Sequence, residues 1–243
     1  MRTFLTVLLG FFVLIANTQE AAKVAPNRKL DASTVVRDSS GTVYPYAIWT
    51  ALLSKGYILK ALDPKNAASD LLLIRLSDEE REARLSKMAA PRESKFFKTG
   101  DPFYAFKVRD MANEKINLKE LRGKVVVLNF WFINCPPCRT EMPDLNNLVD
   151  SFATRPNVVF VSIALDSKDA LEAFLKTNPF KYKVIENGRF LTERLGIKSY
   201  PTHVILDGEG KIAFHTSGLG PQTVYWLRKT INGLLVGSKE SAQ

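Results

Sequence analysis

The sequence has few of the side chains that bind metals or build disulfide frameworks, with two cysteines and two histidines in 243 residues. One intramolecular disulfide at most can form, which excludes a scaffold held together by several bridges. A zinc site needs more ligands than the cysteines supply, and His203 and His215 lie far downstream of Cys135 and Cys138 without ligand spacing. The sequence therefore predicts no metal site and no resident cofactor.

The chain also lacks a basic run interleaved with aromatic residues, although its net charge is +9. Lysines and arginines are interrupted by acidic side chains, as in residues 115–120. Such mixing is typical of a solvated surface rather than of a nucleic-acid interface. We therefore expect no nucleic-acid partner.

The N-terminus carries an apolar run, from Phe4 to Ala16, preceded by Arg2. Its length fits the core of a signal peptide and is short for a bilayer-spanning helix. Small residues around Thr18 predict cleavage before Gln19, which makes 1–18 a signal peptide; an uncleaved anchor is the alternative. We expect an exported, extracytoplasmic and periplasmic protein that meets the membrane only through export or such an anchor.

The most informative stretch begins with an apolar run at 125–133 that is rich in β-branched and aromatic residues. This pattern is typical of a strand buried on both faces. The motif Cys-Pro-Pro-Cys follows at 135–138, and apolar residues at helical spacing then predict a helix over 139–152. The expected unit is strand, tight turn with the cysteine pair, and helix.

Cysteines at the start of a helix are suited to redox chemistry. Unsatisfied N–H groups and the positive end of the helix dipole stabilise a thiolate there, and can lower a thiol pKa from about 8.5 to roughly 3.5–7.5. We expect Cys135 to be the nucleophile and Cys138 to resolve the mixed disulfide, so that the two form a redox-active disulfide. A purely structural bridge is the alternative, but so short a loop would stabilise little.

Further motifs around the cysteine pair resemble the thioredoxin-like thiol–disulfide oxidoreductases of the TlpA/ResA type, in the redoxin (AhpC/TSA-like) superfamily. The resemblance covers roughly residues 96–235. One departure is Asn134, which stands where many relatives have Trp before the first cysteine. The matching segments are Leu121-Arg122-Gly123-Lys124, Asn129-Phe130-Trp131, the motif at 135–138, Glu141-Met142-Pro143 and Tyr200-Pro201-Thr202.

The resemblance implies roles for other residues of the site. The Tyr200–Pro201 bond should be cis and lie against the nucleophile, leaving backbone free to pair with an extended substrate segment; an ordinary turn proline is the alternative. Glu141 lies three residues beyond Cys138 on the same helix face. It matches an acidic residue that could take and return protons, and a simple dipole partner is the alternative. We assign Tyr200, Pro201 and Pro136 to substrate binding.

Strands that alternate with helices, followed by a hairpin and a helix, predict an α/β fold. By resemblance this is a thioredoxin fold, a central mixed sheet flanked by helices, with an added N-terminal β-hairpin and a small α+β N-terminal segment. A right-handed crossover should make the strands at 125–131 and 157–165 parallel. The expected organisation is a signal peptide at 1–18, a flexible lead-in at 19–41, the small α+β segment at 42–95, the thioredoxin-like domain at 96–236 and a loose tail at 237–243.

The remaining elements are predicted from periodicity, caps and turn signals. A capping box at Ser77 to Glu80 predicts the start of a charged helix, and Asp207-Gly208-Glu209-Gly210 predicts a hairpin turn. Helices are expected at 44–54, 78–88, 169–176, 191–195 and 222–235, and strands at 57–62, 71–76, 103–108, 115–118, 180–184, 202–206 and 211–215.

These patterns indicate an exported thiol–disulfide oxidoreductase acting on protein disulfides. The resemblance favours reduction, which requires an upstream membrane or periplasmic thiol reductant. One alternative is a thiol peroxidase (an antioxidant redoxin), but that chemistry needs an isolated cysteine with Thr a few residues before it, and residues 132–134 are Phe, Ile and Asn. The other is a non-enzymatic copper-handling module that uses Cys135, Cys138 and His203.

Overall fold

The structure, a computed structural model, describes residues 28–53, 55–66 and 68–240, without the side chains of 238–240. The chain forms two compact units, Met1–Leu76 and Ser77–Gln243. The predicted signal peptide and its cleavage site lie outside the described residues. Within the described part, no helix is long and apolar enough to cross a membrane.

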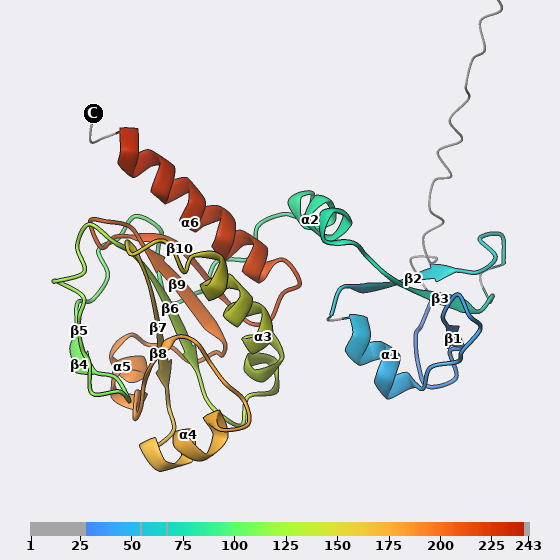
Figure 1. The fold of residues 1–243 in the computed structure, drawn as a ribbon, viewed down its shortest axis with the longest axis horizontal. Helices are drawn as coiled ribbons and strands as arrows, with labels where there is room; N and C mark the ends of the chain where they lie inside the picture. The colour runs from blue at the N-terminus through green and yellow to red at the C-terminus, as the bar shows by residue number, and fades with distance from the viewer. Residues whose placement is uncertain (1–27, 54, 67, 241–243) are drawn as a thin grey trace, which may run out of the picture. The chain divides into compact units, whose positions relative to one another are not determined.

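The first unit is a three-stranded sheet with one helix (Figure 1). Its strand order is β1-β3-β2, with β1 parallel and β2 antiparallel to β3. Trp49 is 1% exposed and is the largest side chain of the core. The predicted helix α1 and the predicted strands β2 and β3 are confirmed, whereas β1 has only two residues and is too short to be predicted from periodicity. The elements are β1 (Val36–Arg37), α1 (Tyr46–Leu53), β2 (Tyr57–Ala61) and β3 (Leu71–Arg75).

The second unit is built on a five-stranded mixed sheet in the order β10-β9-β6-β7-β8 (Figure 1). The strands β6, β7 and β8 are parallel, and β9 is antiparallel to both β6 and β10. This arrangement confirms the predicted thioredoxin fold and the parallel pair formed by β6 and β7. The strands are β6 (Val125–Trp131), β7 (Val158–Ala164), β8 (Lys183–Ile185), β9 (Thr202–Leu206) and β10 (Ile212–Ser217).

Every residue of β6 is buried, because layers cover both faces of the sheet. Alternate side chains of a strand face opposite sides. On one side, Val125 and Val127 pack against the long helices α3 (Pro136–Ser151) and α6 (Thr223–Glu240). A shorter helix, α4 (Lys168–Leu175), adds Leu171 beside Trp131 and the cysteine pair.

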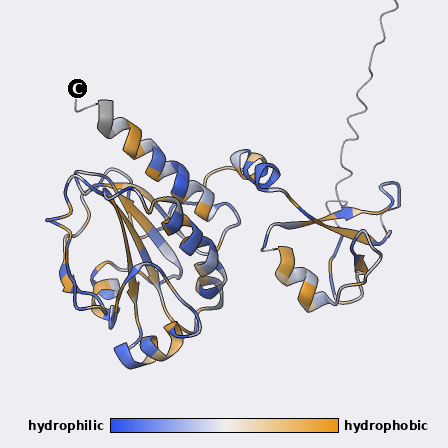
Figure 2. Cartoon of the chain, in the orientation of Figure 1, coloured by the Kyte–Doolittle hydropathy of each residue, from blue (hydrophilic) through white to orange (hydrophobic). Residues whose placement is uncertain are grey.

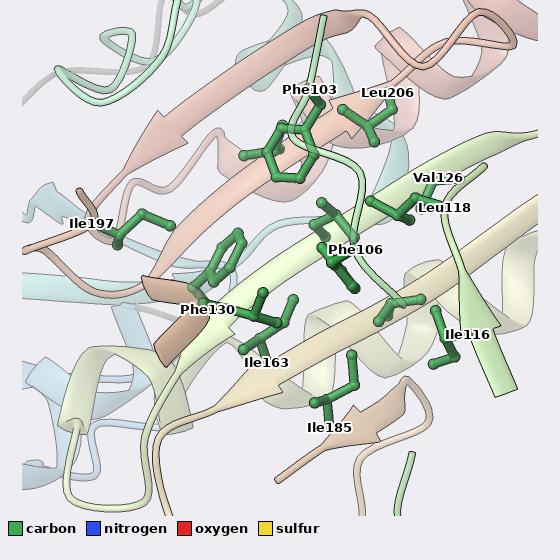
Figure 3. Packing of buried hydrophobic residues seen from close by; sticks show 14 of the residues in the cluster. Phe103, Phe106, Ile116, Leu118, Val126, Phe130, Ile163, Ile185, Ile197 and Leu206 are labelled. Carbon is green, nitrogen blue, oxygen red and sulfur yellow. The ribbon is translucent and has the colours of Figure 1, made fainter. Parts of the chain in front are cut away.

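The opposite side of β6 forms a second core (Figure 3). There Val126, Leu128 and Phe130 meet the helix α5 (Arg189–Arg194) and the predicted hairpin, β4 (Lys107–Arg109) and β5 (Lys115–Asn117). Hydropathy colouring shows the sheet strands as mostly apolar, in contrast to the hydrophilic helix α2 (Figure 2). The side chains contributed by the hairpin and the segments on either side of it are Phe103, Phe106, Ile116 and Leu118.

The first strand of the hairpin is shorter than the strand predicted over 103–108. The backbone before it instead bonds to the turn between β9 and β10: Phe103 N–H donates to the Gly210 carbonyl at 3.1 Å and Gly100 N–H to the Ile212 carbonyl at 2.8 Å. Phe103 is therefore bonded to that turn, and pairing within the hairpin starts at Phe106, whose C=O accepts the Leu118 N–H at 3.1 Å.

The charged helix α2 (Asp78–Ser86) has the predicted capping box at Ser77, but it belongs to the second unit. Arg81 pairs with Asp144 of α3, and Glu82 with Arg228 of α6. The sequence places this helix in the small N-terminal segment at 42–95, whereas in the structure it belongs to the second unit. The expected loose tail also differs, since α6 continues to Glu240.

Candidate active site

The cysteine pair lies at the N-terminus of α3, directly after β6. Cys135 is the N-cap residue, and the two prolines occupy the first helical positions, where a fixed φ and a missing N–H suit the helix. For this reason the helix begins at Pro136 rather than at the predicted Arg139. Cys138 N–H donates to Cys135 Sγ at 3.3 Å, and a disulfide joins the two residues.

The turn that carries Cys135 is held by the neighbouring strands. Ile133 N–H donates to Asp166 Oδ2 at 2.8 Å, and Leu165 N–H donates to the Trp131 carbonyl at 3.1 Å. The Trp131 ring is fully buried and packs in the same cluster as the two cysteines. Trp131 therefore packs beneath the site, and it helps to fix the position of the disulfide.

Cys135 and Cys138 are both almost fully buried. Their exposed fractions are 3% and 2%, but Cys135 stands between two exposed residues, Asn134 and Pro136. Cys138 lies one turn further along the helix and is followed by the exposed Arg139. The order in which a partner reaches the two sulfurs stays a prediction.

The segment before β9 completes the rim of the site. The Tyr200–Pro201 bond is cis, as predicted, and Tyr200 packs against the cysteine cluster with its ring edge-on to Phe132, the centroids 5.4 Å apart. Pro201 C=O accepts the Gly218 N–H at 2.8 Å. Among the described residues, Tyr200 N–H and C=O have no hydrogen-bond partner. The free backbone groups thus belong to Tyr200.

A buried polar cluster lies between α3 and the sheet. Glu141 is 3% exposed and His203 is fully buried, with His203 Nε2 at 3.0 Å from Glu141 Oε1 and 3.2 Å from Oε2. Asn129 Nδ2 donates to Glu141 Oε1 at 3.4 Å and lies 3.3 Å from His203 Nδ1. Asn129 and His203 are directly opposite each other on β6 and β9. The carboxyl beside the cysteine pair is therefore held by two strands.

The phenol of Tyr182 lies near the same carboxyl. Burial, and to a lesser extent the Glu141 carboxylate, raises the pKa of Tyr182 well above its usual range. The hydroxyl therefore stays protonated, and it has no hydrogen-bond partner among the described residues.

The partners of Glu141 were not predicted, although the sequence holds a signal for them. The sequence predicts His203 only as a residue of the strand at 202–206 or a copper ligand, and Asn129 only as part of a motif. Both are polar residues within strands that are otherwise largely apolar. A buried polar residue in such a strand needs a hydrogen-bond partner, and the strand period places Asn129 on the side of β6 that faces α3.

The alternative functions lose support from this geometry. Both ring nitrogens of His203 are engaged inside the protein, so this side chain is not free to bind copper with Cys135 and Cys138. Within the described ranges, no group of three or more His, Cys, Asp or Glu side chains could hold a metal ion. Cys135 is paired with Cys138, whereas the peroxidase alternative needs an isolated cysteine.

The mixed sheet, the helix-capping disulfide and the cis proline define a thioredoxin-like redox protein, and comparisons agree. Residues 99–215 match the AhpC/TSA family. The thiol-disulfide oxidoreductase ResA of Halalkalibacterium halodurans is 30% identical over 129 residues, which are 52% of this chain and 73% of that protein. The thioredoxin-like protein YneN of Bacillus subtilis is 34% identical over 109 residues, 44% of this chain and 64% of that protein.

A solved structure is similar as well. The crystal structure of a putative thiol:disulfide interchange protein DsbE from Chlorobium tepidum has a TM-score of 0.52 and 27% identity, and covers 57% of this chain and 98% of its own. The chain belongs to the thioredoxin-like thiol–disulfide oxidoreductases of the ResA type, which confirms the resemblance drawn from its motifs. It is an enzyme of this class.

Proposed function

We propose that this enzyme is exported and reduces disulfides in partner proteins through Cys135 and Cys138. The observation that carries the proposal is the position of Cys135 as the N-cap residue of α3, one turn before its disulfide partner. Backbone N–H groups and the helix dipole stabilise a thiolate at this position. The exposed neighbours of Cys135 make it the sulfur that a partner meets.

The exchange takes place in two displacements. The Cys135 thiolate attacks one sulfur of the partner's disulfide; that S–S bond breaks, a mixed disulfide forms, and the departing sulfur takes up a proton. Cys138 then loses its proton and attacks Cys135 Sγ, which re-forms the disulfide between them and releases the second partner thiol. Two electrons pass to the partner, and an upstream membrane or periplasmic thiol reductant returns them.

Four further residues act around the sulfurs in this proposal. Glu141 lies three residues after Cys138 on the same helix face, and its carboxylate takes the proton that Cys138 loses. The free N–H and C=O of Tyr200, held by the cis bond to Pro201, pair with an extended segment of the partner. Pro136 is exposed beside Cys135 and contacts the same segment.

Substitution of each cysteine tests the order of attack. Cys138→Ser should accumulate a mixed disulfide with a disulfide-containing model protein, because the resolving thiol is missing. Cys135→Ser should form no such adduct and should show no exchange. Exchange that is undiminished in Cys135→Ser would refute the proposed function. Mass spectrometry of the trapped adduct identifies the sulfur involved.

The reduction potential of the pair tests the direction. Equilibration of the purified protein in thiol buffers should give a value near thioredoxin's, about −270 mV, for a reductase that must be supplied with electrons. A value of about −120 mV would instead indicate a disulfide donor. The same disulfide chemistry serves both directions, so this measurement decides between them.

Export is supported by the N-terminal apolar run. Expression of the full chain in a Gram-negative bacterium should yield a periplasmic protein whose N-terminus is Gln19. Recovery of the uncleaved chain in the membrane fraction would indicate the retained anchor, and recovery in the cytoplasm would contradict export.

A further inference from the structure

Both ring nitrogens of His203 lie within hydrogen-bond distance of polar side chains. An amide nitrogen only donates, so Asn129 Nδ2, at 3.3 Å, requires His203 Nδ1 to be an unprotonated acceptor. The ring hydrogen therefore sits on Nε2, where it points at both oxygens of Glu141, at 3.0 and 3.2 Å. In this arrangement His203 donates from Nε2 to the Glu141 carboxylate.

The same geometry excludes His203 as the proton acceptor. A second proton would have to enter at Nδ1, where it would meet the Asn129 amide hydrogens. The Glu141 carboxylate, in contrast, accepts hydrogen bonds from both neighbours. A proton that leaves Cys138 can therefore go to Glu141 but not onto the ring.

Few other groups act on this carboxylate. Among the described residues, the hydrogen-bond partners of Glu141 are Asn129 on β6 and His203 on β9, and no Lys or Arg forms an ion pair with it. The titratable groups that face it from packed elements are His203 and, from the segment before β8, Tyr182, which stays neutral. Cys138 lies on its own helix. Of the two donors to the Glu141 carboxylate, His203 Nε2–H therefore makes the shorter hydrogen bond, and Asn129 Nδ2 makes the longer one.

We propose that His203 is a positioning residue for disulfide exchange: its Nε2–H holds the Glu141 carboxylate ionised and oriented beside the cysteine pair. The ring thereby sets the pH above which the mixed disulfide is resolved rapidly. This inference rests on the proposed function, because it assigns to Glu141 the proton of Cys138. A hydrogen bond to the charged form of an acid favours that form, and burial without one disfavours it.

In the resolving step the proton and the electrons balance as follows. Cys138 thiol gives its proton to Glu141, and the resulting thiolate attacks Cys135 Sγ. The bond from Cys135 to the partner sulfur breaks, and the partner leaves as a thiolate that takes up the proton carried by Glu141. His203 keeps its Nε2–H throughout and ends the step unchanged.

The first test is a titration of the oxidised full-length protein by nuclear magnetic resonance, which does not depend on activity. Ring nitrogen shifts of His203 should report a neutral ring with hydrogen on Nε2. His203→Leu should move the midpoint of the Glu141 carboxyl titration upward by at least about one pH unit, because a buried donor is lost. His203→Gln, which keeps a donor at the end of the side chain, should restore most of this change.

The matched control is the other buried histidine. His215 is 1% exposed and accepts the Ser94 N–H at its Nδ1, at 3.1 Å, without contact to Glu141. His215→Leu removes a buried ring of the same size from the neighbouring strand and should leave the Glu141 titration unchanged. An equal displacement of the titration in both variants would show that loss of packing, not loss of the donor, is responsible.

The second test is the pH profile of exchange. In His203→Leu, the acid limb of the resolution rate should move upward together with the carboxyl titration. At a fixed pH on that limb, the rate should fall about tenfold for each pH unit by which the limb has moved. Glu141→Gln should abolish this limb, and His203→Leu should then change the profile no further, since residues that act as a unit are not additive.

The results separate this inference from the proposed function. An unchanged Glu141 titration in His203→Leu, or a ring with hydrogen on Nδ1, overturns the role of His203 even if Cys135 and Cys138 exchange disulfides as proposed. A displaced carboxyl titration with an unmoved exchange profile also overturns it. Loss of the cysteine dependence of exchange would refute the proposed function, while the titration still reports whether His203 holds Glu141 ionised.

Discussion

Replacement of Asn129 by Asp would place a second carboxyl against Glu141. The amide nitrogen of Asn129 lies 3.4 Å from Glu141 Oε1, and both side chains are at most 3% exposed. Two carboxylates at that separation repel by about 5 kcal/mol at an effective dielectric constant near 20. The folded variant should therefore keep one extra proton at neutral pH, shared by the carboxyls or placed on Nδ1 of His203.

The extra proton makes the stability of the variant depend on pH. The unfolded chain releases the proton of the new Asp near pH 3.9, whereas the folded chain keeps it to a much higher pH. The folded state then binds more protons, so the variant loses stability as pH rises, by about 1.4 kcal/mol per pH unit. Between pH 5 and pH 7, Asn129→Asp should lose about 3 kcal/mol relative to the parent protein, a large part of a typical domain stability.

The measurement is urea unfolding at both pH values, followed by Trp fluorescence. Trp49 belongs to the first unit, so Trp49→Phe in parent and variant leaves Trp131 and Trp226 to report on the second unit. Asn147→Asp, an exposed position on α3, controls for the change in net charge. Equal losses of stability at the two pH values would refute the deduced contact between Asn129 and Glu141.

Two further changes test other buried groups. Burial lowers the pKa of His215, although the Glu93 carboxylate raises it in part. The folded state therefore binds fewer protons than the unfolded state below about pH 6.5, and stability is lost as pH falls. His215→Phe should flatten this decline, measured as urea midpoints between about pH 7 and pH 5. An unchanged slope would contradict the assignment of the decline to His215. Tyr182→Phe removes a buried hydroxyl without a partner among the described residues. The variant should stabilise the second unit by about 1 kcal/mol and leave the exchange rates unchanged. A loss of stability would show that the hydroxyl is hydrogen-bonded.

Much of the second unit could be predicted because its local signals agree with one another. The apolar run of β6, the prolines that start α3 and the turn at 207–210 each indicate one structure, and the sheet combines them. The strand predicted over 103–108 is confirmed only at its end, in β4, because Phe103 bonds to a turn more than 100 residues later in the chain. Such a long-range competitor leaves no trace in local periodicity.

The candidate site also contains residues that could be predicted from the sequence and residues that could not. Cys135, Cys138 and the cis bond before Pro201 follow from motifs whose chemistry is local. The partners of Glu141 come from two strands, and pairing Asn129 with His203 requires the register of β6 against β9. Sequence shows that each is polar in a largely apolar strand, but not which residue lies opposite.

The register also gives the buried polar residues a role in folding. Thr216, His203, Asn129 and Ser162 are all buried and lie directly opposite one another across β10, β9, β6 and β7. A shift of β9 by one residue would turn its side chains to the wrong face, and a shift by two would set Asn129 against Ile205 or Pro201. A misaligned sheet would then bury polar groups without partners. The contact between Asn129 and His203 therefore favours the observed register of β6 against β9 during folding.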